Sequence, residues 1–334
     1  MSDPGKIAAK IGDAVARVIG PPGEVHELRR LTAGATKATW TFRSQVGDAM
    51  IPLVLQVSDA RSQTTPHTLP RVAPRHDAAL IRAAAESGVP APLVRAVLTP
   101  EFGLGEGYLM DFVAGETIPR RILREPRFAP LRETFASQCG EILARIHSMN
   151  AASLPFLDPL DGRRQIETYR AVYESYDIPI PALEAALLWA EKHAPSPTRT
   201  TVVHGDFRIG NLICGEDRIQ AVLDWELACL GDPMQDLGWL CVRTWRFGGA
   251  DPVGGIGSRE ELFSAYERAS QTVVDPARVR FWEGWGSVKW AIMCLVKGQA
   301  HRREPSERTV EAFAIGRRME EPIHDFLEFL SGKD

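Results

Sequence analysis

The sequence predicts an α+β protein with two lobes, an antiparallel sheet in the first lobe and mostly helices in the second. With 334 residues, the chain exceeds the roughly 250–300 residues at which a single hydrophobic core stops growing. Short apolar runs separated by glycine and proline dominate the first third, which is typical of strands. Apolar residues at helical spacing dominate the remainder. We place the boundary between the lobes near Gly115.

The first lobe is expected over residues 21–114, preceded by an amphipathic helix within residues 1–20. Apolar residues recur at helical spacing in that helix and lysines intervene, unlike the continuous apolar core of an export signal. Gly47-Asp48 is a hairpin turn signal, and an alanine-rich helix is expected over 76–86. The expected strands are 24–32, 39–42, 53–57, 94–98 and 107–113.

The second lobe is expected over residues 115–334 and is mainly helical. A β-hairpin at 201–226 interrupts it. Its first helices are predicted from apolar stripes at 131–149, 166–176 and 183–190. Later helices are predicted from their start signals, which are Asp232-Pro233, the capping box Ser258-x-x-Glu261 and Asp275-Pro276.

Composition excludes several classes of function. The net charge is −4 and the pI about 6.1, which disfavours a nucleic-acid partner. The longest apolar run, residues 290–296, is far shorter than the ~20 residues of a membrane helix. Five cysteines without a CxxC pair predict buried thiols in a reducing compartment. We therefore expect a cytoplasmic protein with neither a nucleic-acid nor a membrane partner.

One segment carries groups suited to catalysis. An apolar run ending at Val203 leads into His204-Gly205-Asp206-Phe207-Arg208-Ile209-Gly210-Asn211, and the hairpin that follows ends in Asp224-Trp225-Glu226. A four-residue turn at 215–218 sets Asn211 opposite about Val222, so Asp224, two residues further, shares its face. An amide oxygen and a carboxylate side by side suit Mg²⁺, which proteins hold with few ligands plus substrate phosphates. Asp206 is placed to accept a proton from a hydroxyl nucleophile, so the pattern predicts phosphoryl transfer.

These residues also carry a family resemblance. The chain resembles the aminoglycoside phosphotransferase-like branch of the protein-kinase-like fold, and within it the kinase-like proteins associated with acyl-CoA dehydrogenases. Besides the hairpin, the resemblance rests on segments 31–36, 88–92, 108–115 and 231–237, and it spans about residues 25–245. It implies a nucleotide-binding first lobe, a helical second lobe with the substrate pocket, and an ATP- and Mg²⁺-dependent phosphotransferase with an alcohol group as acceptor.

The resemblance also implies roles for single residues. Asp206 would be the catalytic base, and Asn211 and Asp224 would bind the metal. The loop Gly34-Ala35-Thr36 would cover the phosphates, and the backbone of Met110, Asp111, Phe112 and Val113 would contact adenine. His204 and Asp236 would brace the catalytic loop, and Asp232 would chiefly cap a helix. Glu226 is left open between orienting the metal ligands, touching the metal and facing solvent.

The first lobe departs from the family pattern at the residue that pairs the phosphates. Relatives place Lys or Arg on the third strand, where this chain has Gln56, and the partner acid is expected near Asp77. A neutral amide can donate hydrogen bonds but supplies no charge. Arg29, Lys37, Arg43 or Arg75 could substitute in space. The alternative function is therefore a pseudokinase or nucleotide-binding scaffold without transfer activity.

The acceptor is expected to be a small molecule with a hydroxyl group. Asp224 is followed almost at once by Gly231-Asp232-Pro233, which leaves no room for an activation loop and disfavours a protein substrate. Residues 251–334 carry 14 acidic and 12 basic residues, so they form no marked acidic surface for a polycationic aminoglycoside. Their aromatic and aliphatic content favours a less cationic, partly apolar compound, and a hydroxyacyl compound fits.

Overall fold

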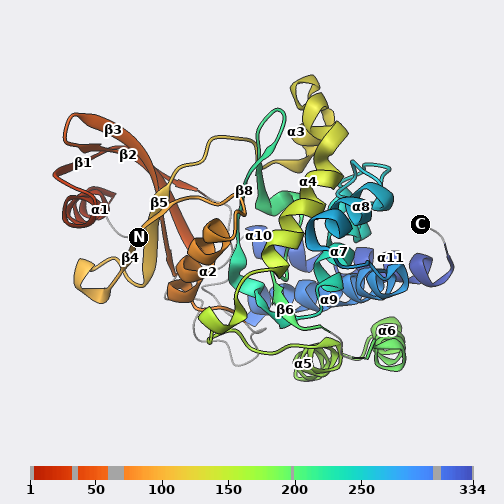
Figure 1. Cartoon of the computed structure of the whole chain (residues 1–334). Helices are drawn as coiled ribbons and strands as arrows, with labels where there is room; N and C mark the ends of the chain where they lie inside the picture. The colour runs from red at the N-terminus through yellow and green to blue at the C-terminus, as the bar shows by residue number, and fades with distance from the viewer. Residues whose placement is uncertain (1–3, 32–36, 59–70, 197–198, 304–309, 333–334) are drawn as a thin grey trace.

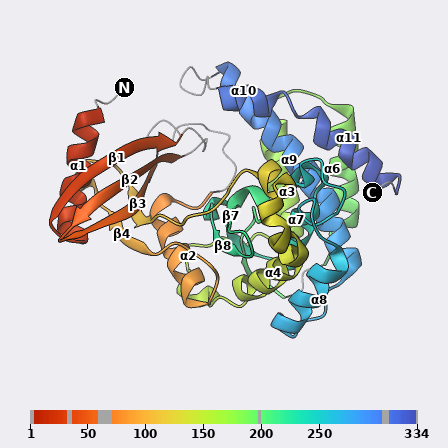
Figure 2. The same cartoon turned by 90° about the horizontal axis from the view of Figure 1, so that it is seen from above.

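The computed structural model describes residues 4–31, 37–58, 71–196, 199–303 and 310–332. The chain forms two lobes, with a sheet at one side and a larger group of helices at the other (Figures 1 and 2). The predicted α+β class, with an antiparallel sheet first and mostly helices after it, is confirmed. Among the described residues, no helix has both the length and the apolar character needed to cross a membrane.

The first lobe is built on an antiparallel sheet with the strand order β1-β2-β3-β5-β4. Val46 pairs with Ala49, so Gly47-Asp48 forms the predicted two-residue turn. The other elements of this lobe are the helices α1 and α2. The bounds are α1 (Pro4–Val18), β1 (Pro22–Leu31), β2 (Lys37–Val46), β3 (Ala49–Ser58), α2 (Pro74–Glu86), β4 (Val94–Leu98) and β5 (Gly107–Asp111).

The two faces of the sheet pack against different helices. Leu53 and Leu55 of β3 lie in a cluster with Ile11 and Val15 of α1. Val54, which alternates with them, belongs to the core that includes α2. Since successive side chains of a strand point to opposite faces, Gln56 lies on the same face as Val54, the face toward α2. This alternation decides which side chains of the sheet can reach the site.

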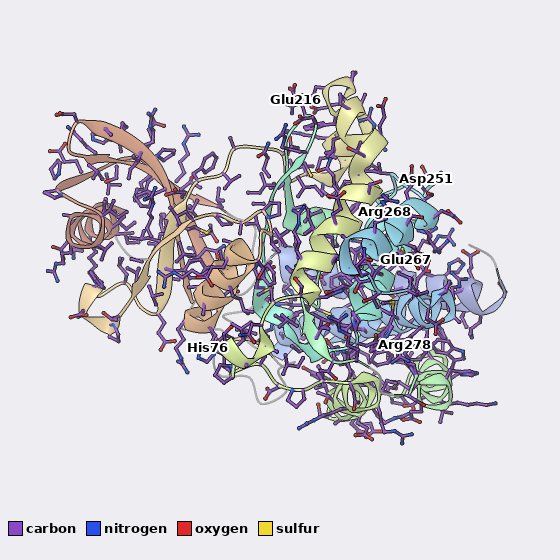
Figure 3. The ribbon with its side chains drawn as sticks, viewed as in Figure 1. His76, Glu216, Asp251, Glu267, Arg268 and Arg278 are labelled. Carbon is purple, nitrogen blue, oxygen red and sulfur yellow. The ribbon has the colours of Figure 1, made fainter. Side chains whose placement is uncertain are left out.

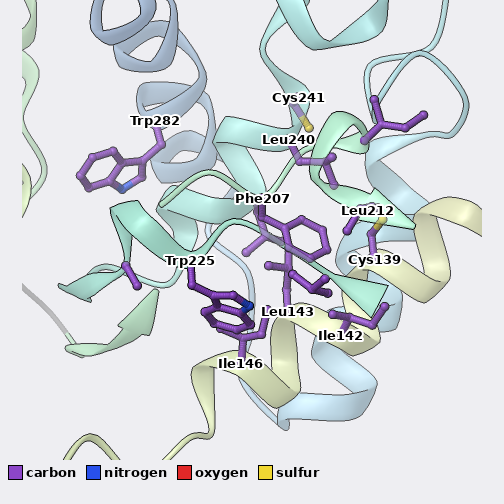
Figure 4. Packing of buried hydrophobic residues seen from close by; sticks show 14 of the residues in the cluster. Cys139, Ile142, Leu143, Ile146, Phe207, Leu212, Trp225, Leu240, Cys241 and Trp282 are labelled. Carbon is purple, nitrogen blue, oxygen red and sulfur yellow. The ribbon is translucent and has the colours of Figure 1, made fainter. Parts of the chain in front are cut away.

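The second lobe packs its helices around a core that Figure 4 shows at its centre, where Phe207 and Trp225 lie against Leu143 and Ile146 of α4. The Ser258 capping box is present, as predicted, and all five cysteines are buried and free. The helices of this lobe are α3 (Pro119–Arg124), α4 (Ala129–His147), α5 (Gly162–Glu174), α6 (Pro181–His193), α7 (Met234–Cys241), α8 (Arg259–Ser270), α9 (Pro276–Arg303), α10 (Val310–Gly316) and α11 (Glu320–Leu330).

Four short strands position the candidate site: β6 (Thr201–Val203), β7 (Leu212–Cys214), β8 (Ile219–Val222) and β9 (Cys229–Gly231). β7 and β8 form the predicted hairpin and lie on the side of the second lobe that faces the sheet (Figures 1 and 2). β9 pairs with β6, a pairing that the sequence did not predict because a strand of three residues carries almost no pattern.

Contacts between the lobes gather around α2. His76, labelled in Figure 3, stacks on Phe156 with 4.1 Å between ring centroids. The amide of Val72 donates to the carbonyl of Glu226 at 2.8 Å. The chain just before α2 is thus tied to the end of the hairpin in the second lobe.

Candidate active site

One buried carboxylate fixes the backbone of the loop that begins at His204, directly after β6. Asp236 of α7 accepts hydrogen bonds from the amides of His204 at 2.7 Å and Gly205 at 2.9 Å. His147 of α4 lies 3.1 Å from the same carboxylate through Nε2. Burial alone would raise the pKa of Asp236, but the hydrogen bond and charge of His147 and the contacts of His204 hold it below its ordinary value. The carboxylate therefore stays ionised and fixes the loop backbone.

His204 braces the loop against the hairpin. Its Nε2 lies 3.1 Å from the carbonyl of Leu223, and its Nδ1 lies 3.2 Å from the amide of Asp206. Burial lowers the pKa of His204, so the ring is neutral, which suits one donating and one accepting nitrogen. Neither nitrogen remains for proton transfer to a substrate.

Asp206 is a nearly buried carboxylate with defined partners. Its Oδ1 accepts from Trp239 Nε1 at 2.9 Å and from Arg208 Nε at 3.1 Å. Its Oδ2 accepts from Asn211 Nδ2 at 2.7 Å. A carboxylate offers about four acceptor positions. Donors in the described part of the chain use three of them, and the fourth lies on Oδ2.

The two predicted metal ligands flank the open end of the hairpin, whose register is one residue from the expected one. Leu212 pairs with Val222, and the amide of Leu223 donates to the carbonyl of Asn211 at 2.8 Å. Asn211 therefore lies opposite Leu223, and the expected pairing with Val222 is wrong. The cause is an irregularity between Ile213 and Cys214, which shifts the register by one residue. Asp224 directly follows Leu223, so it is one residue and not two beyond the partner of Asn211, and strand alternation no longer puts it on the same face. Its left-handed φ of 65° also departs from strand geometry.

Lys37, a cation from the first lobe, lies near three carboxylates, two of them at the end of the hairpin. Lys37, at the start of β2, contacts Asp77 of α2, and its Nζ lies 3.5 Å from Asp224 Oδ1 and 4.0 Å from Glu226 Oε2. Burial alone would lower the pKa of Lys37, but the neighbouring charges of Asp77, Asp224 and Glu226 outweigh it and raise that pKa well above its ordinary value. The lysine is charged, and it links the two lobes at the hairpin.

Gln56 occupies the expected third-strand position but makes no ion pair. The hydroxyl of Tyr108 on β5 contacts Gln56 Oε1 and lies 3.1 Å from Asp77 Oδ2. The sequence predicted the neutral Gln56 as the partner of Asp77. In the structure Asp77 also contacts Lys37, which β2 supplies. Of the four basic residues considered from the sequence, Arg75 instead pairs with Glu106, and neither Arg29 nor Arg43 has an ion pair among the described residues.

The remaining predicted positions lie around this centre. Glu226 pairs with Arg71 at 2.7 Å, so it does not face solvent freely. The N-cap residue of α7 is Pro233, so the expectation that Asp232 itself is the cap is off by one residue. Asp232 still accepts from the amide of Met234, the first residue of α7, at 3.0 Å, and its other oxygen accepts from Trp282 Nε1 and Arg278 Nε on α9, at 2.8 and 2.5 Å.

The predicted contacts to nucleotide are described in part. The amides of Asp111 and Phe112 already donate to Leu93 and Pro52. Met110 lies within β5 between two strands, which leaves Val113 as the member of the predicted adenine-binding segment without a hydrogen bond in the described chain. Gly34, Ala35 and Thr36 lie outside the described residues.

Three partners of the loop were missed from the sequence. His147 and Trp239 contact Asp236 and Asp206, as given above. Lys289 of α9 is buried, donates to the carbonyl of Gly205 at 3.0 Å, and lies 4.4 Å above the ring of Trp239. Burial lowers the pKa of Lys289. The one available signal was a lysine inside the apolar stretch of a long helix.

The sheet-based first lobe and the helical second lobe with its catalytic-type hairpin give the chain a protein-kinase-like fold. The profile of the phosphotransferase enzyme family matches residues 27–282. The chain belongs to this family, which confirms the resemblance seen in the sequence.

Curated relatives extend well beyond the matched region. Acyl-CoA dehydrogenase family member 10 of Mus musculus is 34% identical over 176 residues, which are 49% of this chain and 16% of that protein. Acyl-CoA dehydrogenase family member 11 of Homo sapiens is 33% identical over 201 residues, which are 54% of this chain and 25% of that protein. The chain thus matches a quarter or less of the length of these relatives.

Solved structures share the fold over the whole chain. A provisionally assigned aminoglycoside phosphotransferase from Ralstonia eutropha JMP134 superposes with a TM-score of 0.73 at 21% identity, covering 98% of this chain and 99% of that one. Spectinomycin phosphotransferase APH(9)-Ia, in complex with ADP and spectinomycin, gives a TM-score of 0.62 at 14% identity, covering 96% and 98%. At these identities the likeness concerns the fold.

Proposed function

We propose that the protein is a Mg²⁺-dependent ATP phosphotransferase acting on a hydroxyl group of a small molecule. The observation that carries the proposal is a pair of contacts at the two ends of the hairpin: Asn211 donates to Asp206 at 2.7 Å, and the ammonium of Lys37 lies 3.5 Å from Asp224. One carboxylate with a free acceptor position, two oxygen ligands for a metal and one charged lysine are the parts that phosphoryl transfer requires. The nucleotide complexes of family members with this fold, such as that with ADP, support ATP as the donor.

The donor set fits a magnesium ion. Asn211 uses its Nδ2 group on Asp206, through the side chain and through the main-chain oxygen at 2.9 Å, which leaves its Oδ1 for a cation. Asp224, the residue after the hydrogen-bonding partner of Asn211, would add a carboxylate. Within the described part of the chain, no three His, Cys, Asp or Glu side chains form a metal site, so phosphate oxygens and water would complete the coordination. Bound there, Mg²⁺ would neutralise phosphate charge.

In the proposed reaction, Asp206 orients the acceptor hydroxyl and takes its proton on Oδ2. The acceptor oxygen forms a bond to the γ-phosphorus, the bond from that phosphorus to the β–γ bridging oxygen breaks, and ADP leaves. Lys37 supplies the positive charge that Gln56 lacks. This lysine favours transfer over the alternative scaffold function, which rested on a neutral residue at that point.

Calorimetric titration of ATP with and without Mg²⁺ tests the proposal. The wild type should bind, and Asp224→Ala should lose the Mg²⁺-dependent part. Asp217→Ala, an exposed carboxylate in the turn of the same hairpin, is the matched control and should bind as the wild type does. Absence of binding at millimolar ATP would refute the proposal.

Transfer itself is tested with a panel of hydroxyl compounds by following ADP formation. Asp206→Asn should lower the rate about 10²–10⁴-fold, the usual contribution of a general base, while keeping Mg-ATP affinity. An unchanged rate in this variant would remove Asp206 from the role of base.

A further inference from the structure

A cavity of about 1280 Å³ lies between α3, the segment that follows α7, and α11. Its lining carries five arginines against three carboxylates. The arginines are Arg120, Arg124, Arg243, Arg246 and Arg318. Arginines thus outnumber carboxylates in the lining, although the whole chain has a net charge of −4.

This cavity adjoins the catalytic loop. Arg208, which donates to Asp206, stacks on the ring of Trp245 at 4.6 Å, and the residues on either side of Trp245 line the cavity. On the α3 side, a Cβ added at Gly210 would stand 3.9 Å from Cγ of Pro119, another lining residue. A molecule in the cavity would thus lie beside the loop that carries Asp206 and Asn211.

Three of the arginines are already neutralised by carboxylates. Arg246 pairs with Glu283 at 3.1 Å and Arg318 with Glu321 at 2.7 Å. Arg243 pairs with Glu328 and lies 3.7 Å from Asp325. These pairs shape the wall but leave little free charge for a ligand.

Arg120 and Arg124 differ, because neither has a carboxylate within ion-pair distance in the described chain. They stand four residues apart on α3, so both point to one side of the helix, where like charges repel. Both are exposed at the cavity. An anionic group between them would relieve this repulsion, and the planar guanidinium matches carboxylate and phosphate oxygens in a bidentate fashion.

We propose that this cavity binds the phosphoryl acceptor, and that the acceptor is a hydroxy compound bearing a carboxylate or phosphate group. Arg120 and Arg124 bind the anionic group, and the hydroxyl lies toward Asp206. The assignment rests on the proposed phosphotransferase function and names its substrate class. It excludes polycationic acceptors, which Arg120 and Arg124 would repel.

The test uses four probes on one hexose skeleton: glucose 6-phosphate, gluconate, glucose and glucosamine. Their affinities are measured by calorimetry on the full chain, on Arg120→Gln/Arg124→Gln and on a control, Arg163→Gln/Arg164→Gln. The control pair is exposed on α5 and lies outside the cavity lining. Comparing the two anions separates phosphate from carboxylate recognition.

We expect at least one anion to bind the wild type and the control at least fivefold more tightly than glucose or glucosamine, a preference that two accessible ion pairs can supply. The Arg120→Gln/Arg124→Gln variant should lose this preference. Equal or tighter binding of glucosamine, no anion binding at millimolar concentration, or an anion preference that survives in the variant would each overturn the assignment.

Mg-ATP titration of the same variants separates this inference from the proposed function. Arg120→Gln/Arg124→Gln should bind Mg-ATP like the wild type. Loss of nucleotide affinity in that variant would place the two arginines in the nucleotide site and overturn the acceptor assignment. Absence of Mg-ATP binding in the wild type would instead count against the phosphotransferase function.

Discussion

Replacing Lys37 by glutamine removes the cation that three carboxylates share. The side chain of Lys37 is 9% exposed and that of Asp77 is 1% exposed, so their ion pair is almost fully withdrawn from water. Asp224 and Glu226 approach the same ammonium at 3.5 and 4.0 Å. The substitution therefore leaves a buried carboxylate without its counter-charge and removes the positive charge from the proposed phosphate site.

Two magnitudes follow. Removing one partner of a buried ion pair costs about 3–5 kcal/mol, and one pair at the Asp224 separation is worth about 5 kcal/mol at an effective dielectric constant of 20. Because Asp224 is partly exposed, we expect the free energy of unfolding to fall by about 3 kcal/mol, at the low end of that range. A hydrogen bond from a charged donor contributes about 1.5–3 kcal/mol, so Mg-ATP affinity should fall roughly 10- to 100-fold.

The assay is calorimetric titration of Mg-ATP, with urea unfolding for stability. Lys192→Gln, an exposed lysine on α6, is the matched control. A second variant, Lys37→Gln/Gln56→Lys, returns the lysine to β3. Gln56 already meets Asp77 through Tyr108, and Asp77 Oδ1 is buried without a hydrogen-bond partner. This variant should recover most of the affinity.

Wild-type affinity for Mg-ATP in Lys37→Gln would refute the reasoning, since the lysine would then not contact phosphate. Loss of affinity without recovery in the double variant would show that the charge must arrive from β2. Circular dichroism on each variant checks that a loss of binding is not a loss of fold.

Three further predictions concern the catalytic loop. Asp236→Asn should lower the free energy of unfolding by about 2–4 kcal/mol, because the amides of His204 and Gly205 donate to different oxygens of Asp236 and asparagine replaces one of these oxygens by a donor. A free energy of unfolding in urea within about 1 kcal/mol of the wild type, the worth of one hydrogen bond, would contradict this. Because the pKa of His204 is lowered in the folded protein, its imidazole takes up a proton more readily in the unfolded chain as the pH drops below about 6.5. Stability should therefore decrease as the pH is lowered below that value, by up to about 1.4 kcal/mol per pH unit. The free energy of unfolding in urea, measured one pH unit above and one pH unit below 6.5, should decrease less in His204→Gln than in the wild type. Equal decreases in the two proteins would argue against this role of His204. Lys289→Met should change stability by less than about 1.5 kcal/mol, because a costly buried charge leaves together with its hydrogen bond, yet slow transfer by displacing Gly205; an unchanged kcat would remove Lys289 from the positioning of the loop.

Much of the fold could be predicted because its signals are local. Gly47-Asp48 between alternating strands, the Ser258 capping box and the apolar stripe of α4 each fall within one stretch of chain. The predicted register of β7 and β8 was wrong by one residue, because the irregularity next to Cys214 depends on packing and has no local sequence signal. β9 was missed because its three residues show no period.

The candidate site divides in the same way. Asp206 and Asn211 lie five residues apart in one loop, so their contact could be expected from the sequence. The position of Asp224 could not be derived as reliably, because its expected face depended on a register that is wrong by one residue. Lys37 lies 40 residues before Asp77 in the sequence and 187 before Asp224, and only the folded sheet brings the three together. Trp239 and Lys289 reach the loop from separate helices and resemble ordinary core residues in the sequence.

The origin of the lysine bears on how kinase-like chains are sorted into active and inactive ones. A criterion that considers only the third-strand position would find glutamine here and count the chain among the inactive members. The ammonium nevertheless reaches the acid of α2 from the adjacent strand. A criterion for catalytic activity in this fold should therefore consider which cation lies near the acid of α2 in space, whichever strand supplies it.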